Sequence, residues 1–332
     1  MSETILSVAQ AETLVADALM RSRTGEVNAR IVAKALVTAE ADGLKGHGLS
    51  RVASYAAQAK AGKIDGFAIP TASHTRPGVI AVDAAHGFAY PAIDLALAGL
   101  PDAARACGLA AASVRRSHHA GVAGAPVEHL AEQGFVALLF ANTPAAMAPW
   151  GGRSATFGTN PIAFACPLPG RAPIVVDLSL SKVARGNILA ARGRGEEIPE
   201  GWALDVAGRP TTDPAAALAG TMVPLGDAKG TALALMVELL AAGLTGSNYA
   251  AEASSFLDDK GDPPGTGQLL LALDPDAFGP NGLMRFAALA QSIEGQDGAR
   301  LPGARRLALR QTARREGLHV TTKQIAEIEA LG

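Results

Sequence analysis

The chain has 332 residues, with 29 Lys and Arg against 31 Asp and Glu, which gives a formal net charge of −2 at pH 7. This near balance provides no basic footprint for DNA or RNA, so a nucleic-acid partner is not expected. Hydrophobic residues make up 48% of the chain and charged residues 18%, which is enough to fill a large core and excludes disorder over most of the length.

The two cysteines, Cys107 and Cys166, lie far apart and outside any CxxC pair. They form neither a disulfide framework nor a thiolate zinc cluster, so a reducing cytoplasm is the expected location. The N-terminal residues lack the basic start and apolar core of a secretion signal. The longest apolar run, 230–244, is shorter than the roughly 20 residues that cross a bilayer and contains Glu238. We therefore expect a buried helix there and no membrane anchor.

The first sixty residues predict helices in series. Ser7 and Gln10 form a capping box at the start of the first helix. A second helix is expected over residues 25–42, where Gly43 ends it, and a third is expected to start near His47.

From residue 79 the pattern changes to short apolar runs that alternate with helical stretches, which is typical of an α/β fold. Two of the expected strands, 161–167 and 173–179, have no helix between them long enough for a parallel crossover, so part of the sheet is mixed or antiparallel. Residues 191–228, rich in glycine, proline and charge, are expected to form a long functional surface excursion. The remaining expected strands are 79–83, 109–114, 135–142 and 267–275, and the expected helices are 91–108, 126–134, 230–245 and most of the chain after 275.

Standard motifs do not identify the chemistry. The sequence contains no GxGxxG dinucleotide fingerprint, no P-loop, no HExxH and no GxSxG elbow. The nearest glycine pairs, in HHAGVAG and ARGRGEE, have the wrong spacing for a Rossmann fold.

His47 and Arg51 are the first candidate pair, because on a helix that begins at Gly46 they would share one face. A guanidinium beside an imidazole suits a small 2-oxo or 2-imino acid. The arginine binds the carboxylate, and the histidine gives a proton to the adjacent oxygen or nitrogen. The spacing alone favours the alternative, a surface helix start with a solvated arginine.

His118 and His119 are the second candidate pair. They precede residues 121–124, which open a helix whose N-terminal N–H groups can receive phosphate. One alternative is a polar strand end before a turn. Another is a zinc site that includes His129, although no carboxylate or thiolate lies at a matching spacing. A zinc-dependent hydrolase that uses His118, His119 and His129 therefore stays open as a second class of function.

Several segments carry a resemblance that covers nearly the whole chain in order. They are HGLSR (47–51), SHHAGVAG (117–124), APWGG (148–152), FGTNPIAFACP (157–167), VVDLSLSKVARG (175–186), IPEGWALD (198–205), PLGDAKG (224–230) and LALDPDAFGP (271–280). Together they resemble the family of malate/L-lactate dehydrogenases that lack a Rossmann fold. That family also includes sulfolactate, ureidoglycolate and diketogulonate enzymes and the Δ1-piperideine-2-carboxylate and Δ1-pyrroline-2-carboxylate reductases.

The resemblance implies an α/β fold with a non-Rossmann, sulfolactate dehydrogenase-like mixed sheet surrounded by helices, and NAD(H) or NADP(H) as cofactor. It also implies a homodimer with the active site near the subunit interface. On this basis we expect a helical segment over 1–75 that packs with the C-terminal part. An α/β region for cofactor and substrate is expected over 76–250, and a C-terminal strand with helices over 251–332.

Matching positions imply roles for individual residues. His47 matches the proton donor and Arg51 the anchor of the substrate carboxylate, while His119 matches a histidine beside the nicotinamide. The other substrate-side positions are Thr159, Arg185 and Gly186. The cofactor-side positions are His119, Ala120, Gly121, Val122, Ala123, Asp177, Leu178, Ser179, Lys229, Arg305 and Arg306.

One departure from the family pattern concerns the proton donor. The family commonly has a serine directly before the catalytic histidine, and this chain has Gly46. The aspartate of the proposed relay has no clean counterpart either. Another group or a water must therefore orient His47, or His119 carries more of the proton transfer.

These observations predict an NAD(P)H-dependent reductase of a small 2-imino or 2-oxo carboxylate. The preferred substrate is Δ1-pyrroline-2-carboxylate or Δ1-piperideine-2-carboxylate, giving L-proline or L-pipecolate, because a protonated ring imine needs less help from an oriented acid. The alternative in the same family is a 2-hydroxy-acid dehydrogenase of the malate, lactate, sulfolactate or ureidoglycolate type. A nucleotide-binding relative without activity is a third possibility, and no motif chooses between NADH and NADPH.

Overall fold

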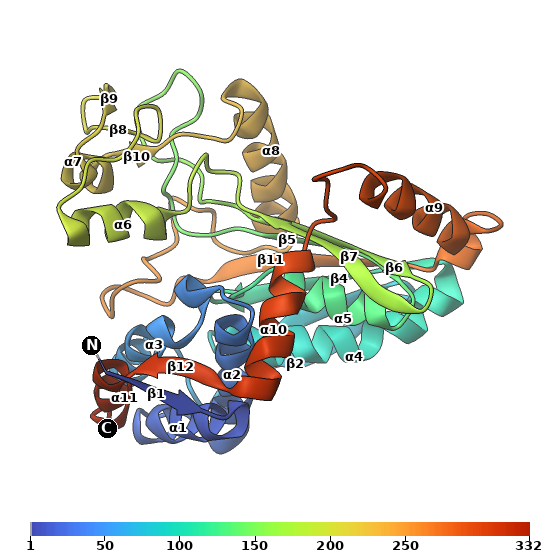
Figure 1. Cartoon of the computed structure of the whole chain (residues 1–332), viewed down its shortest axis with the longest axis horizontal. Helices are drawn as coiled ribbons and strands as arrows, with labels where there is room; N and C mark the ends of the chain where they lie inside the picture. Colours follow the sequence, from blue (N-terminus) through green and yellow to red (C-terminus); the bar gives the residue numbers. More distant parts are fainter. Residues whose placement is uncertain (1) are drawn as a thin grey trace.

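A seven-stranded sheet forms the centre of the molecule in the computed structural model, which describes residues 2–332 (Figure 1). The strand order is β2-β3-β4-β11-β5-β6-β7, in which β3 and β4 run parallel and the other neighbours run antiparallel. The mixed sheet expected from the sequence is therefore confirmed. Its strands are β2 (Thr71–Arg76), β3 (Val79–Asp83), β4 (Leu109–Ser117), β5 (Val136–Ala141), β6 (Ile162–Leu168), β7 (Arg171–Leu178) and β11 (Thr266–Leu273).

Helices α4 (Ala89–Cys107) and α5 (Gly124–Glu132) cover one face of this sheet. Apolar residues at intervals of three and four along α4, including Ile93, Leu97 and Leu100, are buried against it. The helix ends at Gly108, whose positive φ of 81° suits a residue without a side chain.

The opposite face carries α8 (Ala228–Glu238) and the π-helical turn that follows it (Leu239–Gly243). The sequence predicts this helix to be buried, but the structure buries only one side, because α8 lies at the edge of the fold. Leu235 is 47% exposed and Leu239 is 52% exposed, and Leu233 and Met236 are exposed as well. None of the described helices, which cover residues 2–332, is long and apolar enough to span a membrane.

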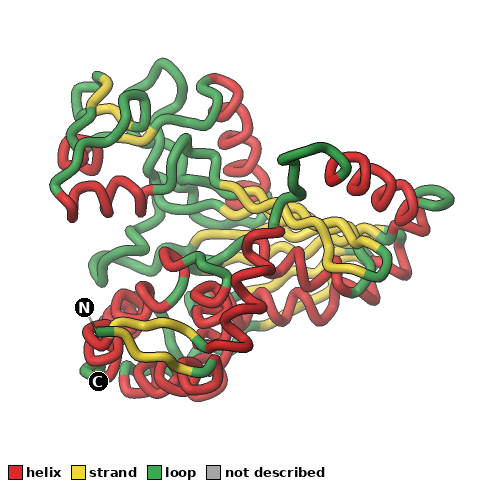
Figure 2. The backbone as a smooth tube through the Cα atoms, in the orientation of Figure 1, coloured by secondary structure: helices red, strands yellow, loops and turns green. Residues whose placement is uncertain are grey.

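Residues 191–228 fold more than the sequence indicates. The first of these residues complete α6 (Arg185–Arg194), and the others form a three-stranded sheet and one short helix. These elements make a lobe over the face of the central sheet that carries α8 (Figure 2). The expected surface excursion is a folded lobe, because apolar residues such as Ile198, Ala203 and Ala217 supply it with a core. Its elements are β8 (Ala203–Leu204), β9 (Pro210–Thr211), α7 (Pro214–Ala219) and β10 (Thr221–Met222).

Both ends of the chain build the opposite lobe. Strands β1 (Glu3–Leu6) and β12 (Leu318–Thr321) pair antiparallel, so the two termini lie close together (Figure 1). The capping box of Ser7 and Gln10 is confirmed at the start of the first helix. The helices of this lobe are α1 (Val8–Arg21), α2 (Glu26–Ala41), α3 (Val52–Ala61), α10 (Ala304–Glu316) and α11 (Thr322–Glu329), while Pro275–Ala277 forms a 3-10 turn and α9 (Gly282–Glu294) lies on a separate arm.

The predicted third helix does not begin at His47. Two 3-10 turns, Lys45–His47 and Leu49–Arg51, precede α3. They are separated by Gly48, whose Cα lies so close to Glu40 that a side chain there would collide with it. The backbone N–H of Leu49 donates to the same carboxylate at 3.0 Å. This contact with α2 interrupts the helix, and local sequence does not reveal it.

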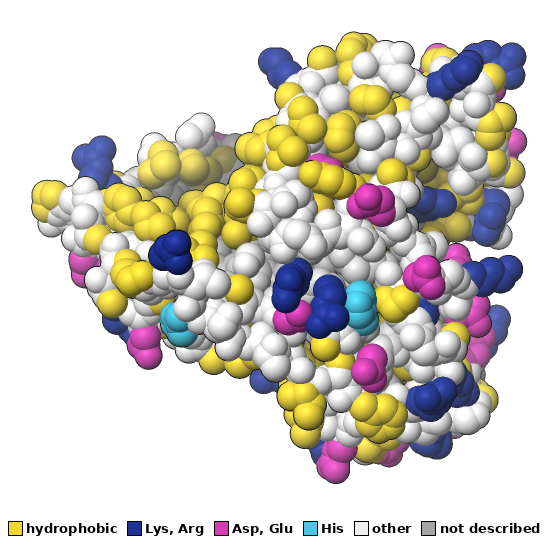
Figure 3. All heavy atoms as spheres, turned by 180° about the vertical axis from the view of Figure 1, so that it is seen from behind, with side chains coloured by type: hydrophobic (Ala, Val, Ile, Leu, Met, Phe, Trp, Pro, Cys, Tyr) yellow, Lys and Arg dark blue, Asp and Glu magenta, His cyan; other side chains and the backbone are white. Residues whose placement is uncertain are grey.

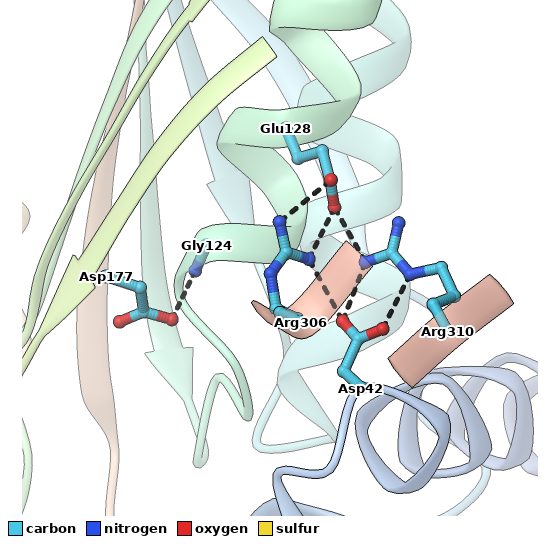
Figure 4. Close-up of polar contacts among 6 residues, drawn as sticks. All are labelled: Asp42, Gly124, Glu128, Asp177, Arg306 and Arg310. Atoms are coloured by element: carbon cyan, nitrogen blue, oxygen red, sulfur yellow. Dashed lines mark hydrogen bonds and ion pairs between the residues drawn. The ribbon is translucent and has the colours of Figure 1, made fainter. Parts of the chain in front are cut away.

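Four buried charged side chains connect the N-terminal helices, the sheet layer and the C-terminal helix (Figure 4). Arg306 donates to Glu128 at 2.7 and 2.8 Å and to Asp42 at 3.0 Å, and Arg310 donates to the same two carboxylates at 2.6 to 2.8 Å. Burial alone would raise the pKa of Glu128, but the hydrogen bonds from the two arginines outweigh it and lower that pKa. We call this group the four-charge cluster.

Replacing one carboxylate of the four-charge cluster should destabilise the fold strongly. Glu128→Gln leaves two buried guanidinium groups with a single carboxylate, and such a change typically costs about 3 to 5 kcal/mol. Urea unfolding measures this loss.

Glu294→Gln is the matched control, because Glu294 also binds an arginine in bidentate fashion but its pair with Arg171 is about half exposed. It should cost less than about 1 kcal/mol. Equal losses in the two variants would contradict a special role for the buried cluster.

Candidate active site

The two histidines that the sequence singles out for proton transfer lie face to face. The rings of His47 and His119 have centroids 5.2 Å apart and planes inclined by 19°. His47 is the last residue of the first 3-10 turn, and His119 follows the end of β4. The fold therefore brings together residues that are separated by 72 positions, as the resemblance implies.

His119 is held by a pair of buried tyrosines. The hydroxyl of Tyr55, on α3, lies 2.6 Å from His119 Nδ1, and the hydroxyl of Tyr90, on α4, lies 3.1 Å from that of Tyr55. Tyr55 has no exposed surface and Tyr90 is 9% exposed. Sequence reasoning missed both tyrosines, because at helical spacing they look like ordinary core residues.

His118 also packs against Tyr55, at a centroid distance of 5.7 Å, and is only 2% exposed. Its Nε2 is 2.8 Å from Oε1 of Gln58, and Phe256 packs against its ring at a centroid distance of 4.8 Å. Phe256 also packs against His119 at 5.3 Å. The buried Lys63 holds the loop that carries Phe256 by donating to three of its carbonyl oxygens, at 2.6 to 3.0 Å. These contacts give the site a fixed wall.

The three histidines are neutral at pH 7. Burial, and then the nearby charge of Arg51, lowers the pKa of His47 to about 4. Burial, followed by the charges of Lys63 and Arg51, lowers the pKa of His118 to about 3. The pKa of His119 falls well below its usual value for the same two leading reasons, burial and Arg51. A neutral imidazole acts through the one N–H of its tautomer.

Arg51 is the cation of this site. Its Nε donates to the carbonyl oxygen of Gly46 at 2.7 Å, which fixes the stem and leaves both terminal nitrogens for a carboxylate. The shared helical face expected for His47 and Arg51 is wrong, because the two residues belong to successive 3-10 turns. Their proximity is nevertheless real, since Arg51 perturbs the pKa of His47.

Thr159 lies in a rigid loop before β6. Its backbone N–H donates to Oγ1 of Thr143 at 2.9 Å, and the two hydroxyls are 3.3 Å apart. Behind it, the side-chain amide of Asn160 donates to the buried carboxylate of Glu238 at 2.7 Å. Burial raises the pKa of Glu238 although hydrogen bonds from Asn160 and its neighbours oppose this shift. Glu238 is thus a supporting residue that the sequence showed only as a charge in an apolar run.

Arg185 and Gly186 begin α6. Nε of Arg185 is buried and has no hydrogen-bond partner within the described part of the chain. Burial lowers the pKa of this guanidinium. A buried, unpaired donor on a cation favours binding of an anion at this position.

The cofactor-side positions fall into two groups. Asp177, at the end of β7, accepts a hydrogen bond of 2.7 Å from the N–H of Gly124, the first residue of α5 (Figure 4). Burial raises the pKa of Asp177, while the bond from Gly124 opposes this shift. The start of α5 thus meets the end of β7. Lys229 lies in the first turn of α8, on the opposite face of the sheet.

The two C-terminal arginines differ in their surroundings. Arg306 belongs to the four-charge cluster and is engaged by Glu128 and Asp42. Arg305 and Arg306 both line a cavity of about 520 Å³ together with Arg300, but Arg305 is not part of the four-charge cluster. Of the two, Arg305 is therefore better placed to meet a phosphate.

Comparison with known proteins identifies the family. The family model described as malate/L-lactate dehydrogenase matches residues 6–329. The chain belongs to this family. It is 52% identical over 326 residues to a (2R)-3-sulfolactate dehydrogenase (NADP(+)) of Chromohalobacter salexigens, with 98% of this chain and 97% of the relative covered. It is 39% identical over 331 residues to a Δ1-pyrroline-2-carboxylate reductase of Ancylobacter novellus, covering 98% and 97%.

The fold agrees with the same family. The crystal structure of Δ1-piperideine-2-carboxylate reductase from Pseudomonas syringae superimposes with a TM-score of 0.94 at 36% identity, covering 99% of this chain and all of the other. The predicted family and non-Rossmann fold are therefore confirmed. As a member of this malate/L-lactate dehydrogenase family, the chain is an NAD(P)-dependent oxidoreductase.

The residues present fit such a cofactor. A cavity of about 780 Å³, within the usual size range of ligand sites, lies between α2, α4 and α5, and His47, Tyr90, Ala120 and Val122 are among the residues that line it. Asp177, Lys229 and Arg305 lie outside its lining. At Gly121, between Ala120 and Val122, φ is +68° and a Cβ would lie 2.5 Å from the hydroxyl of Tyr90. Only glycine fits there, which keeps this stretch of backbone close to the cavity. The assignment of individual cofactor contacts stays a prediction.

The zinc site that the sequence left open is not assembled. Among residues 2–332, no group of three or more histidine, cysteine or acidic side chains is arranged to hold a metal ion. His118 and His119 are instead engaged by Gln58 and Tyr55, while His129 lines the 780 Å³ cavity from α5.

The buried histidines should make the fold less stable in mild acid. Below about pH 6.5 the histidines of the unfolded chain bind protons. The buried histidines of the folded chain bind them only when the pH falls to their lowered pKa values. The free energy of unfolding should therefore fall as the pH drops from 6.5 toward 4. Urea unfolding at a series of pH values measures the slope.

The slope is proportional to the number of protons that the chain takes up on unfolding, and His118→Gln should lower this number by close to one. His74→Gln, on the exposed strand β2, is the control and should leave the slope as in the wild type. Identical slopes for His118→Gln and wild type would show that His118 does not stay neutral in the folded state.

Proposed function

We propose that the protein reduces a small 2-oxo acid that carries a second anionic group, with NADPH as the hydride source and with sulfopyruvate and (2R)-3-sulfolactate as the substrate pair. Support comes from the 52% identity to a relative named (2R)-3-sulfolactate dehydrogenase (NADP(+)), against 39% to a relative named as an imine reductase.

The observation that carries this proposal is the second unpaired cation. Arg51 presents free terminal nitrogens, and Arg185 has a buried Nε without a partner in the described chain. A dianion with carboxylate and sulfonate groups has one anionic group for each arginine, whereas a cyclic imino acid has a single carboxylate. Leaving the buried Nε of Arg185 without a partner is costly unless an anion meets it.

The residues would divide the work as follows. Arg51 binds the carboxylate and sets the position of C2, and Thr159 offers a hydroxyl to the substrate. Arg185 binds the second anionic group. The bound reduced nicotinamide supplies a hydride to C2. A histidine N–H gives a proton to the oxygen on which charge develops, which is general acid catalysis.

A cyclic imine is the second candidate substrate. A protonated ring imine already carries its proton, so it suits a site in which Nδ1 of His47 is buried and lacks a hydrogen-bond partner anywhere in residues 2–332. The similarity to imine reductases, including the structure with a TM-score of 0.94, supports this reading.

The preference for NADPH rests on the name of the sulfolactate relative and on Arg305. Arg305 and Arg300 line the 520 Å³ cavity together with Gly303 and Ala304, at the start of the 13-residue helix α10. Two guanidinium groups beside a helix N-terminus suit the 2′-phosphate.

We also propose that the protein is a homodimer. The exposed apolar side of α8 and that of α9 both lack cover from the described chain, and Met284 and Leu289 on α9 are each 64% exposed. Seen from behind, apolar side chains extend along the hollow between the arm and the lobe above it (Figure 3). An apolar surface of this kind is typical of a subunit interface.

A panel of substrates tests the proposed reaction. The purified protein should oxidise NADPH faster than NADH, with a higher kcat/KM for sulfopyruvate than for pyruvate, oxaloacetate, Δ1-pyrroline-2-carboxylate or Δ1-piperideine-2-carboxylate. Arg185→Gln should lower kcat/KM for sulfopyruvate by about tenfold or more, because a hydrogen bond to a charged group is lost, and change that for pyruvate less than about threefold.

Arg192→Gln, on the exposed side of the same helix α6, is the control and should behave as the wild type. Turnover of the cyclic imines alone would overturn the proposal in favour of the second candidate.

The dimer has its own test. Leu235→Glu should convert it to a monomer in sedimentation equilibrium, because a charge would enter the apolar contact. Val206→Glu is the control, since Val206 is 72% exposed in the loop between β8 and β9 and should leave the dimer intact. A wild-type protein that sediments as a monomer would refute the dimer.

A further inference from the structure

We propose that Tyr55, with Tyr90 behind it, orients His119 and makes this histidine the proton donor to the substrate in place of His47. The two tyrosines are positioning residues, since they act through the imidazole. The inference rests on the proposed function, which is reduction of a C2 carbonyl, and it names the residue that donates the proton in that reduction.

The contrast between the two stacked histidines carries the argument. Nδ1 of His119 has the hydroxyl of Tyr55 at 2.6 Å. Nδ1 of His47 is buried and meets no hydrogen-bond partner among the described residues. Gly46, directly before His47, has no side chain that could orient the ring, and apart from its two chain neighbours nothing in the described chain lies within 4 Å of a Cβ placed there. A donor with a defined tautomer needs such a partner, and of the two stacked histidines His119 has one among residues 2–332.

The tyrosines are themselves firmly held. The ring of Tyr55 packs against Phe88 at a centroid distance of 5.6 Å and against the edge of His118 at 5.7 Å. Its hydroxyl meets that of Tyr90 at 3.1 Å, and the Tyr90 side chain lines the 780 Å³ cavity. Burial raises the pKa of both phenols, so both remain protonated and able to donate.

The direction of the hydrogen bonds from Tyr90 through Tyr55 to His119 follows from the reaction. The hydroxyl of Tyr90 donates to that of Tyr55, and Tyr55 donates to Nδ1 of His119, so the imidazole proton lies on Nε2. The opposite direction would place the proton on Nδ1 and leave Nε2 able only to accept. His47 then serves as the packing partner that covers the other face of the donor ring.

The proton balance closes through this chain. The bound nicotinamide would supply the hydride for the C2–H bond. The C=O electron pair then moves to oxygen, which takes the proton from Nε2 of His119. Nδ1 takes the proton of Tyr55, Tyr55 takes that of Tyr90, and Tyr90 takes one from water of the cavity. Histidine and both tyrosines end neutral, with the imidazole proton on Nδ1. Before the next turnover Nε2 takes a proton from water, while Nδ1 returns its proton through Tyr55 and Tyr90 to water. The starting tautomer is thereby restored, and one solvent proton is consumed for each turnover.

Tyr55→Phe tests the proposal, because it removes the hydroxyl and keeps the ring. We expect kcat to fall at least about tenfold while KM changes less than about threefold, since general acid catalysis is lost without loss of binding. The proton inventory of kcat in H2O/D2O mixtures should be curved in the wild type, where several protons move together, and should become linear in Tyr55→Phe. Tyr249→Phe is the control, because Tyr249 is 42% exposed and makes no ring contact with the histidines among the described residues, and it should match the wild type.

A second readout is independent of turnover. Nitrogen-15 NMR of labelled histidines, with the His119 signals assigned by their loss in His119→Gln, should show an Nε2–H tautomer in the wild type and a mixture in Tyr55→Phe. An Nδ1–H tautomer in the wild type, or the same tautomer in both proteins, would overturn the proposal. So would unchanged kcat in Tyr55→Phe together with an inactive His47→Asn.

The two levels of proposal fail separately. If the panel shows that the substrate is a cyclic imine, the proposed function is wrong, and the kinetic comparison is made with that imine. If no substrate is turned over, the NMR tautomer alone decides whether Tyr55 orients His119.

Discussion

The four-charge cluster is the constraint on which the rest of the structure depends, because it joins three segments that each carry part of the site. Asp42 follows α2 and stands only a few residues before His47, while Glu128 lies on α5, directly after the loop that contains His119. Arg306 follows Arg305 at the beginning of α10. All four side chains are at most 13% exposed, so water screens their attraction little. A shift in any of the three segments would leave a buried charge unpaired, and this cost opposes the shift. The cluster therefore fixes the position of the histidines relative to the cofactor side.

Much of the fold was predictable because it follows from local patterns. The strand expected over 79–83 has the same bounds in the structure, and the capping box at Ser7 is present. Tertiary contacts decide the rest. The place of β11 in the middle of the sheet depends on its pairing with β4 and β5, which no local pattern contains. An apolar run such as 230–244 predicts a helix with an apolar surface but not what covers that surface.

The site was predictable to a similar degree, for a different reason. Histidines and arginines attract attention because they carry chemistry, and the structure does bring His47, His119 and Arg51 together. Arg306 fits the expected cofactor segment in sequence, yet two carboxylates already bind it. Tyr55 has no motif, because its role depends on one hydroxyl meeting an imidazole 64 residues away. A sequence shows which groups are available, whereas geometry decides which of them are engaged.

The field of Arg51 connects substrate binding to proton donation. Its charge lowers the pKa of His47, His118 and His119, after burial as the leading cause in each case. An anionic substrate that pairs with this guanidinium cancels part of that field, so the imidazoles become better able to hold a proton once the substrate is present. By linkage, conditions that favour a protonated site also favour the anion. A neutral histidine with a fixed tautomer therefore suits the free protein. It avoids a buried positive charge beside Arg51, and it keeps an N–H ready for the moment at which negative charge develops on the substrate oxygen.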